Sequence, residues 1–421
     1  MTQKKATIQW VMNPGYQLDV EPEGPSGFLH PDRIVTARSF TRSVPGYQAT
    51  PLVDLKNVAA EWKLKGIYVK DESRRFGLRS FKVLGGLFAI SNVICHKLGI
   101  SLHETPFKAL AKAETLTQTG PMIFVTATDG NHGRGIAWAA KILGHQAVIF
   151  MPKGASPFRV ERIRQEGAQV FVTDMNYDDT VRHAKAYADE QGGQVVQDTA
   201  WAGYEEIPAW IMQGYAVMMD EIRDQLEETG RPLPTHVFLQ AGVGSFAASI
   251  QGYMAECWGP ERPRTVVLEP DKADCFYRTI SINDGLPHAV TGALDTIMAG
   301  LACGEPNLMA WRILRKYTQA FVACPDHLAA RGMRILGAPV SGDAQVVAGE
   351  SGAIGMGFLN ELLRNPEAQP LRNKLRIDES SLVLVINTEG DTDPRHYREV
   401  VWEGRHASDT WGDKGEETPT P

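Results

Sequence analysis

The stretch PMIFVTATDGNHGRGIAWAAKILGHQAVIFMP, residues 121–152, decides the fold of this chain. It begins with a short apolar run, passes through a loop rich in glycine into a helical pattern, and ends in a second apolar run. Short apolar runs of this kind predict buried strands. Two strands joined by a helix through short connections are parallel, so the stretch predicts an α/β fold.

The same alternation extends to about residue 200. The predicted strands are Ile123–Thr126, Ala147–Met151, Gln169–Thr173 and Gln194–Gln197. The predicted helices lie near Arg134–Leu143, Pro157–Glu166 and Asp178–Gln191. Ser156-Pro157 is a good start and Gly167 a good end for the second of these helices.

A second α/β unit follows later in the chain. It consists of a strand at His236–Gln240, a turn at Ala241–Ser245, a helix at Phe246–Glu256 and a strand at Arg264–Glu269. Ser381–Asn387 is almost purely Leu, Val and Ile, which is typical of a strand buried on both faces.

These patterns predict two α/β domains with a cleft between them. The small domain is expected at residues 91–198, and the large domain at residues 1–90 together with 199–421. The polar segment Ser91–Gly120 is interpreted as an insertion, and the polar stretch 407–421 as a disordered tail.

Composition limits the classes of function. A net charge of −7 argues against a nucleic-acid binder, because neutralising phosphates needs a surplus of Lys and Arg. There is neither a signal-like apolar segment nor a run of about 18 apolar residues, which predicts a cytoplasmic protein without membrane contact. The five cysteines are widely spaced and suggest neither a zinc site nor a disulfide framework.

The first candidate site loop is VKDESRRFGLRSFKVLGG, residues 69–86. Lys82 follows a phenylalanine and precedes Gly85-Gly86, so apolar residues and close backbone packing should surround it. It is either a solvated helix lysine or an amine whose pKa is lowered for Schiff-base chemistry. Composition alone favours the solvated residue.

The second loop is TDGNHG, residues 128–133, between a predicted strand and the helix after it. Ligands of open α/β sheets bind beyond the carboxyl ends of strands, where helix N-termini offer free N–H donors. Asp129, Asn131 and His132 gather there. The alternative is a tight turn in which Asp129 caps the helix.

The third loop is AGVGSFA, residues 241–247, whose small residues let backbone amides surround a phosphate. It also fits the dinucleotide pattern G-x-G-x-x-A with Glu269 as the ribose-binding acid. Glu269 comes 27 residues after Gly242, later than the usual spacing of roughly 20. An NAD-dependent oxidoreductase therefore stays a rival from another class.

SFKVLGG, DGNHG and GVGS, in this order, resemble the fold-type II pyridoxal-phosphate enzymes, which include serine/threonine dehydratases and cysteine synthases. Within that group the chain looks most like the diaminopropionate ammonia-lyases. Long segments carry this resemblance, among them VKDESRRFG, VQDTAWAGY and NTEGDTDPRHYREVVWEG. The resemblance implies a two-domain fold like that of the tryptophan synthase β subunit, a homodimer, and an active site in the cleft between the domains.

The resemblance also implies roles for single residues. Lys82 would carry the cofactor, pyridoxal 5′-phosphate, as a Schiff base. The cofactor phosphate would lie against Gly242, Val243, Gly244 and Ser245. Asn131 would hold the ring hydroxyl, Thr388 would face the pyridine nitrogen, and Glu350 would line the pocket. The amides of Asp129, Gly130 and His132 would receive the carboxylate of a small amino-acid substrate.

Asp129 departs from the serine that the dehydratase and racemase relatives carry here. A carboxylate at this place would take a Cα proton from the face opposite Lys82, and would attract a cationic substrate side chain. Asp198, after another predicted strand, is the second candidate for holding a substrate ammonium; the alternative is a structural carboxylate. These residues imply β-elimination of ammonia from 2,3-diaminopropionate, which gives pyruvate and two ammonia.

Besides the oxidoreductase, two alternative functions remain open at this point. A serine or threonine dehydratase would use the same scaffold on a hydroxyl substrate, and a non-catalytic amino-acid sensor would share the fold alone. Cys275 and Cys303 could approach each other near the pocket and form a redox-sensitive bridge. The expected cytoplasmic location favours free thiols.

Overall fold

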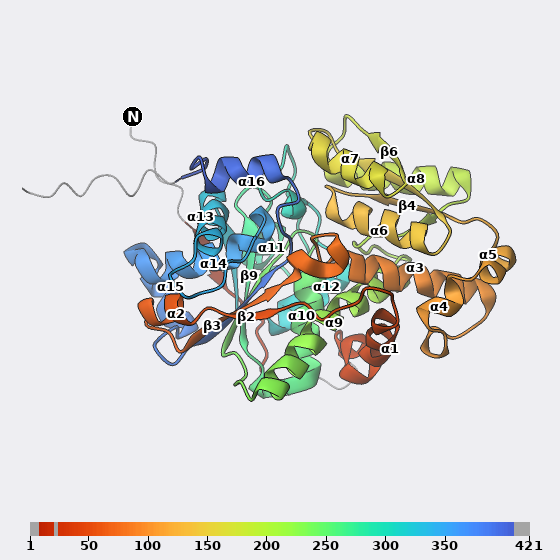
Figure 1. The fold of residues 1–421 in the computed structure, drawn as a ribbon. Coiled ribbons are helices and arrows are strands. Elements are labelled where there is room, and N and C mark those ends of the chain that lie inside the picture. The colour runs from red at the N-terminus through yellow and green to blue at the C-terminus, as the bar shows by residue number, and fades with distance from the viewer. Residues whose placement is uncertain (1–7, 21–23, 408–421) are drawn as a thin grey trace, which may run out of the picture.

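The computed structural model describes residues 8–20 and 24–407 of the chain. Its strands form two sheets, and helices cover both faces of the larger one (Figure 1). The part with the smaller sheet lies at the upper right of Figure 1, around α6, α7 and α8. The predicted α/β architecture with parallel-rich sheets is confirmed.

The larger sheet has seven strands in the order β1-β10-β9-β8-β11-β3-β2. Its strands are β1 (Gln9–Met12), β2 (Leu52–Asp54), β3 (Gly66–Asp71), β8 (His236–Gln240), β9 (Arg264–Pro270), β10 (Ala320–Cys324) and β11 (Leu382–Asn387). The five inner strands are parallel, and the edge strands β1 and β2 are antiparallel to their neighbours.

The smaller sheet has four parallel strands in the order β6-β5-β4-β7. They are β4 (Ile123–Ala127), β5 (Gln146–Met151), β6 (Gln169–Val172) and β7 (Gln194–Val195). The last strand is shorter than the predicted Gln194–Gln197. The reason is that the Gln197 side chain, not its backbone, accepts the hydrogen bond of the Ala127 amide, at 3.0 Å.

The helices of the chain are α1 (Pro31–Arg42), α2 (Lys56–Glu61), α3 (Lys82–Leu98), α4 (Phe107–Leu110), α5 (Ala113–Thr119), α6 (Asn131–Ile142), α7 (Pro157–Gln165), α8 (Tyr177–Gln191), α9 (Glu206–Thr229), α10 (Ser245–Trp258), α11 (Cys275–Ile282), α12 (Leu308–Tyr317), α13 (Asp326–Gly337), α14 (Glu350–Arg364), α15 (Gln369–Leu375) and α16 (Pro394–Val401). Short 3-10 segments lie between several of them.

Strand β11 shows how the large sheet is buried on both sides. Val383 and Val385 pack into one core, with α13, α14 and α15. Leu384 and Ile386 pack into the other, with α3, α9 and α10. Because successive side chains of a strand point to opposite faces, a strand between two helical layers must be apolar throughout. This is why the run at 381–387 was readable from the sequence.

The domain boundaries at residues 90/91 and 198/199 stay predictions. The small sheet occupies residues 123–195, inside the predicted small domain. Helix α3, however, crosses residue 91 without interruption and ends at Leu98, and α4 and α5 follow. The segment interpreted as an insertion is therefore partly the second half of this helix.

Helix α3 packs tightly because it carries glycines. A Cβ at Gly85 would lie 2.5 Å from the Tyr215 ring and 2.8 Å from the Ile211 carbonyl oxygen on α9. A Cβ at Gly86 would lie 2.8 Å from Ile136 on α6. Real Cβ atoms do not come so close, so any larger residue would push these helices apart. The two glycines thus hold the helix that begins with Lys82 against both neighbours.

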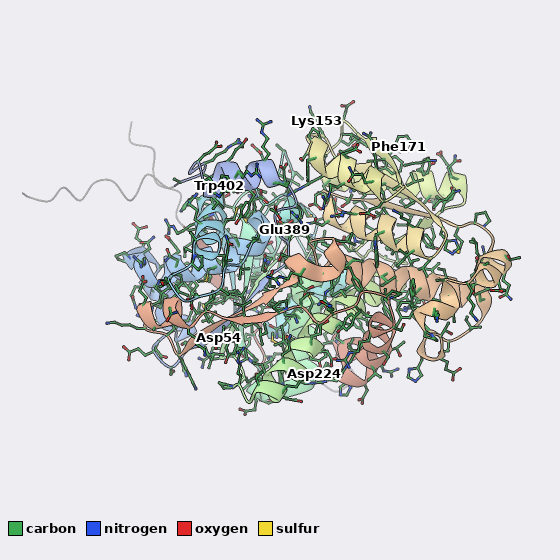
Figure 2. All side chains as sticks on the ribbon, viewed as in Figure 1. Asp54, Lys153, Phe171, Asp224, Glu389 and Trp402 are labelled. Atoms are coloured by element: carbon green, nitrogen blue, oxygen red, sulfur yellow. The ribbon has the colours of Figure 1, made fainter. Side chains whose placement is uncertain are left out.

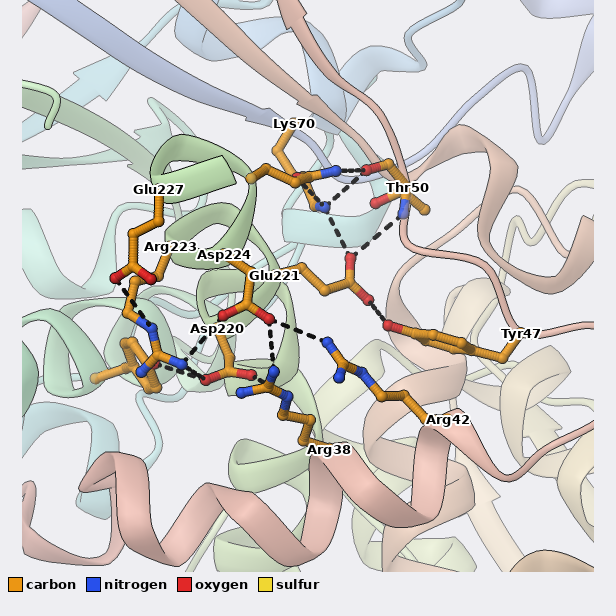
Figure 3. A network of polar contacts seen from close by, with 12 residues as sticks. Arg38, Arg42, Tyr47, Thr50, Lys70, Asp220, Glu221, Arg223, Asp224 and Glu227 are labelled. Carbon is orange, nitrogen blue, oxygen red and sulfur yellow. Dashed lines mark hydrogen bonds and ion pairs between the residues drawn. The ribbon is translucent and has the colours of Figure 1, made fainter. Parts of the chain in front are cut away.

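A buried ion network ties α9 to β3, as Figure 3 shows for Glu221 and Lys70. The same network reaches the segment Glu72–Gly77, which leads into α3. The Glu221 carboxylate on α9 binds the Lys70 ammonium and the Arg75 guanidinium, both at 2.7 Å. It also accepts a hydrogen bond from the Tyr47 hydroxyl at 2.8 Å. Arg75 binds Glu72 as well, at 2.8 Å, so the buried charges balance.

Candidate active site

One cavity collects the three loops that the sequence singled out. It lies at the carboxyl ends of β4, β8 and β11 and at the N-termini of α3, α6 and α10. Its predicted members are Lys82, Asp129, Asn131, His132, Asp198, Gly242, Val243, Gly244, Ser245 and Thr388. Glu389, also in its wall, is labelled near the middle of Figure 2. The cavity thus unites residues that are up to 308 positions apart in sequence (Phe81 to Glu389).

Lys82 is the first residue of α3 and forms an ion pair with Asp198. The Tyr215 hydroxyl lies 3.4 Å from the same Asp198 oxygen. Burial disfavours the ammonium, but the Asp198 carboxylate, together with Tyr215 and Asp129, outweighs burial and raises the pKa of Lys82 above its usual value. The pKa therefore shifts in the direction opposite to the expected one, and the interpretation as a solvated lysine is wrong, because the side chain is only 16% exposed.

Asp198 is almost fully buried, and its environment keeps it ionised. Burial alone would raise its pKa, but Lys82 and then His132 lower the pKa to about 2. His132 is itself buried, and burial lowers its pKa. Its Nε2 lies 2.8 Å from the carbonyl oxygen of Val196, which can only accept, so Nε2 carries the hydrogen. The unpartnered Nδ1 then lies 3.9 Å from Asp198.

In the 128–133 loop, the Asp129 side chain does not cap the helix that follows. The Thr128 hydroxyl oxygen, not Asp129, accepts the amides of Gly130 and Gly133, at 2.9 and 3.0 Å. Gly130, with φ +152°, is the N-cap of α6, so the helix begins at Asn131 rather than near Arg134. The interpretation of Asp129 as a helix cap is wrong. Its Oδ2 is buried without a hydrogen-bond partner.

The pKa of the Asp129 carboxyl group is shifted toward neutral pH. Burial raises the pKa of Asp129 to about 6, against the opposing effects of Arg159 and Lys82. A carboxyl group with a pKa near the working pH is suited to take up and release protons.

The loop 242–245 forms a cradle that only small residues permit. A Cβ at Gly242 would lie 3.0 Å from the Leu301 Cα. Gly244 has φ +94°, and a Cβ there would collide with the Phe276 ring. The loop runs into the N-terminus of α10 at Ser245, where free backbone amides favour an anion. This geometry fits a phosphate group.

Two polar groups complete the wall. Thr388 Oγ1 accepts a hydrogen bond from Gln240 Nε2 at 2.9 Å, so its own hydrogen is directed elsewhere. Asn131 Nδ2 donates to Glu389 at 2.5 Å, and Glu389 also accepts the Ser351 amide at 3.1 Å. Glu389 and Ser351 had not been predicted as site residues. Glu389 directly follows Thr388 in the NTEG motif, and that position was the available signal.

Gly130 and Glu350 lie outside the residues that line this cavity. Gly130 shapes the turn beneath it. Glu350 lines a neighbouring cavity, where its carboxylate lies 3.6 Å from Arg159 and 3.3 Å from His396. Tyr177, which borders both cavities, was also not predicted. Its signal was weak, because it stands at a helix start whose neighbours are ordinary polar residues.

The cysteines near the cavity are free thiols. Cys275 and Cys303 are both buried and unbridged, and the other three cysteines are also unbridged, with Cys257 only partly buried. Within the described ranges no three His, Cys, Asp or Glu side chains are placed to hold a metal. Likewise, no helix there is both long and apolar enough to cross a bilayer.

Glu269 is not placed to bind a ribose. It is fully buried and accepts the amides of Phe276 and Tyr277 at 2.8 and 2.7 Å, at the start of α11. Burial raises its pKa to about 8. Glu269 therefore binds the N-terminus of α11 and is not available as the ribose-binding acid that the dinucleotide interpretation requires.

Comparison with known proteins agrees with the geometry. Residues 44–387 match the family described as pyridoxal-phosphate dependent enzyme. The chain is 50% identical over 370 residues to the diaminopropionate ammonia-lyase of Salmonella typhimurium, covering 88% of this chain and 92% of that protein. The chain belongs to the diaminopropionate ammonia-lyase family. Its cofactor is pyridoxal 5′-phosphate.

Solved structures of this family have the same fold. The Escherichia coli diaminopropionate ammonia-lyase in complex with D-serine superposes with a TM-score of 0.88 at 46% identity, covering 95% of this chain and 98% of that one. The same enzyme with an aminoacrylate–pyridoxal phosphate azomethine gives 0.87, again at 46% identity, over 96% and 99%. A threonine deaminase from Solanum lycopersicum shares the fold, with a TM-score of 0.65 at 18% identity over 92% and 96%. The predicted fold-type II architecture is confirmed.

Proposed function

We propose that this chain is a pyridoxal-phosphate-dependent lyase that converts 2,3-diaminopropionate and water into pyruvate and two molecules of ammonia. One observation carries the proposal. A single cavity contains both the Lys82 amine and the Asp129 carboxyl group. Asp129 has an oxygen without a hydrogen-bond partner and a pKa of about 6. The activity of relatives that are 50% identical supports it.

The residues of the cavity suit the cofactor. Lys82 would hold it covalently, the amides of the 242–245 loop would bind its phosphate, and Asn131 would bind its ring hydroxyl. Bound there, pyridoxal phosphate withdraws electrons from Cα and acidifies the Cα hydrogen. Thr388 would donate its hydrogen to the pyridine nitrogen, because its oxygen already accepts from Gln240. A neutral hydroxyl makes a milder electron sink than a carboxylate would, which suits β-elimination.

We assign proton transfer to two groups on different walls of the cavity. The substrate carboxylate binds at the amides of Asp129 and His132, because the Gly130 amide already donates to Thr128 Oγ1. Lys82 Nζ takes the Cα proton of one enantiomer and Asp129 Oδ2 that of the other. Asp198 forms an ion pair with Lys82, and we propose that it holds a substrate ammonium.

Loss of ammonia needs an acid, because an unprotonated amine is a poor leaving group. The Lys82 ammonium donates this proton to the β-nitrogen. The enamine released to water then hydrolyses to pyruvate and the second ammonia.

Substitution of Asp129 tests the two-base assignment. In Asp129→Asn, kcat should fall by about 10²–10⁴ on one enantiomer of diaminopropionate, because a general base has been lost. Activity on the other enantiomer should persist. The exposed variant Glu228→Gln serves as the control, with both activities unchanged. Equal losses on both enantiomers would refute separate bases.

The cofactor anchor is tested with Lys82→Ala. The wild-type protein should show the visible absorption band of a lysine-bound cofactor, which borohydride removes, and the variant should not. An unchanged band in the variant would refute the assignment of Lys82.

A serine or threonine dehydratase is the second candidate, because it would use the same scaffold. Asp129 favours the diamino acid, since it places a negative charge where the dehydratase relatives have serine. Pyruvate release from diaminopropionate should therefore exceed that from serine. Much faster release from serine would overturn the substrate assignment.

A homodimer in the cytoplasm without a nucleic-acid partner is also part of the proposal. The family resemblance supports the dimer, and the net charge of −7 argues against nucleic acid. Light scattering of the purified protein should give twice the chain mass of 46.3 kDa. A monomer would refute this part alone.

A further inference from the structure

A second cavity of about 350 Å³ adjoins the reaction cavity, and the two share Asp129 and Tyr177. Its other walls come from the 152–159 segment, from the 293–302 segment, and from Glu350, Asp393 and His396. Lys153, on its rim, is labelled at the top of Figure 2, in the part of the molecule with the smaller sheet. The second cavity therefore borders the reaction cavity directly.

Negative charge predominates in this second cavity. Its carboxyl groups belong to Asp129, Asp295, Glu350 and Asp393. Among the described residues, its cationic side chains are Lys153 and Arg159. His396 also lines it, and burial lowers the pKa of this imidazole. A cavity with more carboxylates than cations attracts positively charged ligands and raises their local concentration.

Arg159 is shared between two of the carboxyl groups. Its guanidinium lies 3.9 Å from Asp129 Oδ2 and 3.6 Å from Glu350 Oε2, with a side chain only 8% exposed. Both distances are too long for hydrogen bonds. Arg159 Nε and Asp129 Oδ2 are buried without hydrogen-bond partners. Of these two atoms, Asp129 Oδ2 is the acceptor that an ammonium ligand can use.

The carboxyl groups of Asp129 and Glu350 share a single nearby guanidinium, that of Arg159. Burial raises the pKa of Glu350 to about 7, although Arg159 opposes it, and that of Asp129 to about 6. One guanidinium does not neutralise both groups. An incoming ammonium would supply the missing charge and donate hydrogen bonds to these oxygens.

We propose that this second cavity is an antechamber that binds the side-chain ammonium of a diamino acid and delivers the molecule past Asp129 to the reaction cavity. The inference rests on the proposed function and deepens it, because it names the place where a cationic substrate is selected over a neutral one. A diamino acid with both amines protonated carries one positive charge more than serine does. The antechamber recognises this charge.

Two carboxylates at the outer part of the antechamber provide the test. Asp295 is exposed, and Asp393 is half-buried at the N-cap of α16. Asparagine at 393 keeps the oxygen that accepts the His396 amide, so the helix start should survive. Neither residue lines the reaction cavity. The variants are Asp295→Asn, Asp393→Asn and the double variant, with Glu228→Gln as an exposed control outside both cavities.

The readout is the ratio of kcat/KM for diaminopropionate to kcat/KM for D-serine, measured with holoenzyme. Removing one charge about 7 Å from the ligand in water should lower this ratio about threefold, and the double variant should lower it about tenfold. The kcat on both substrates and the melting temperature should stay near wild type. Added salt should lower the ratio in the wild type more than in the double variant.

The outcomes separate the inference from the proposed function. If the double variant keeps the wild-type ratio, or if Glu228→Gln lowers it equally, the antechamber is refuted while the lyase activity stands. If both substrates lose kcat/KM equally, the cavity does not distinguish the cationic substrate from the neutral one, and the inference also falls. A holoenzyme that turns over serine but not diaminopropionate refutes the proposed function first, and the antechamber with it.

Discussion

Glu221→Gln should destabilise this protein far more than an ordinary surface substitution. Glu221 is 2% exposed and bridges the Lys70 ammonium and the Arg75 guanidinium, which are themselves 0% and 1% exposed. Glutamine has nearly the same shape but no charge. The variant would therefore leave two buried cations with the Glu72 carboxylate as their remaining buried counter-ion.

The magnitude follows from this uncompensated charge. Breaking a buried ion pair by removing one partner costs about 3–5 kcal/mol of unfolding free energy. Glu227 is the matched control, since it lies on the same helix and also pairs with an arginine, but its side chain is 70% exposed and 3.9 Å from Arg223. Glu227→Gln should cost less than about 1 kcal/mol.

Urea unfolding of the holoenzyme, followed by tryptophan fluorescence, measures the difference. With an m-value of about 3 kcal/mol/M, Glu221→Gln should lower the midpoint by about 1 M or more, and Glu227→Gln by less than about 0.3 M. Equal shifts in the two variants would show that the buried network does not stabilise the fold.

The same variant should change the acid stability. Burial alone would raise the pKa of Glu221, but Arg75 and Lys70 lower it to about 2. Its usual value in an unfolded chain is about 4.3, so the charged form stabilises the fold above that pH. This contribution is lost as the pH falls from about 4 through 2, and the loss should be absent in Glu221→Gln. If Glu221→Gln lost stability between about pH 4 and 2 as the wild type does, the lowered pKa of Glu221 would be contradicted.

Further predictions concern the site. Gly244→Ala should weaken cofactor binding about tenfold or more, because φ +94° and a neighbouring ring leave no room for Cβ; cofactor titration of the apoprotein checks this, and unchanged affinity would contradict it. Asp198→Asn removes the charge that raises the pKa of Lys82, so cofactor capture by the apoprotein should reach half its maximal rate about one to three pH units lower. An unshifted midpoint would show that Asp198 does not set this pKa. Peptide mapping without reductant should find Cys275 and Cys303 as free thiols, and a Cys275–Cys303 peptide would revise the structure.

Local patterns were sufficient to predict the three loops of the site and the strands β4, β8 and β11 that end at it, whereas β1, β2, β3 and β10 were not predicted. β8 spans His236–Gln240 as predicted, and β5 and β9 differ from the predicted strands by a single residue. A buried strand is apolar whatever lies beside it, and a phosphate loop needs small residues wherever it occurs. The sequence by itself therefore determined the α/β class, the three loops and, through long matching segments, the family.

Only the tertiary structure decided what each side chain meets. Lys82 pairs with Asp198, 116 residues away, and this contact reverses the direction expected for its pKa. Asn131 binds Glu389 across 258 residues. Glu350 faces Arg159 in the antechamber rather than the reaction cavity. The charge state of a buried group depends on the distance to other charges, and chain folding sets that distance independently of local sequence.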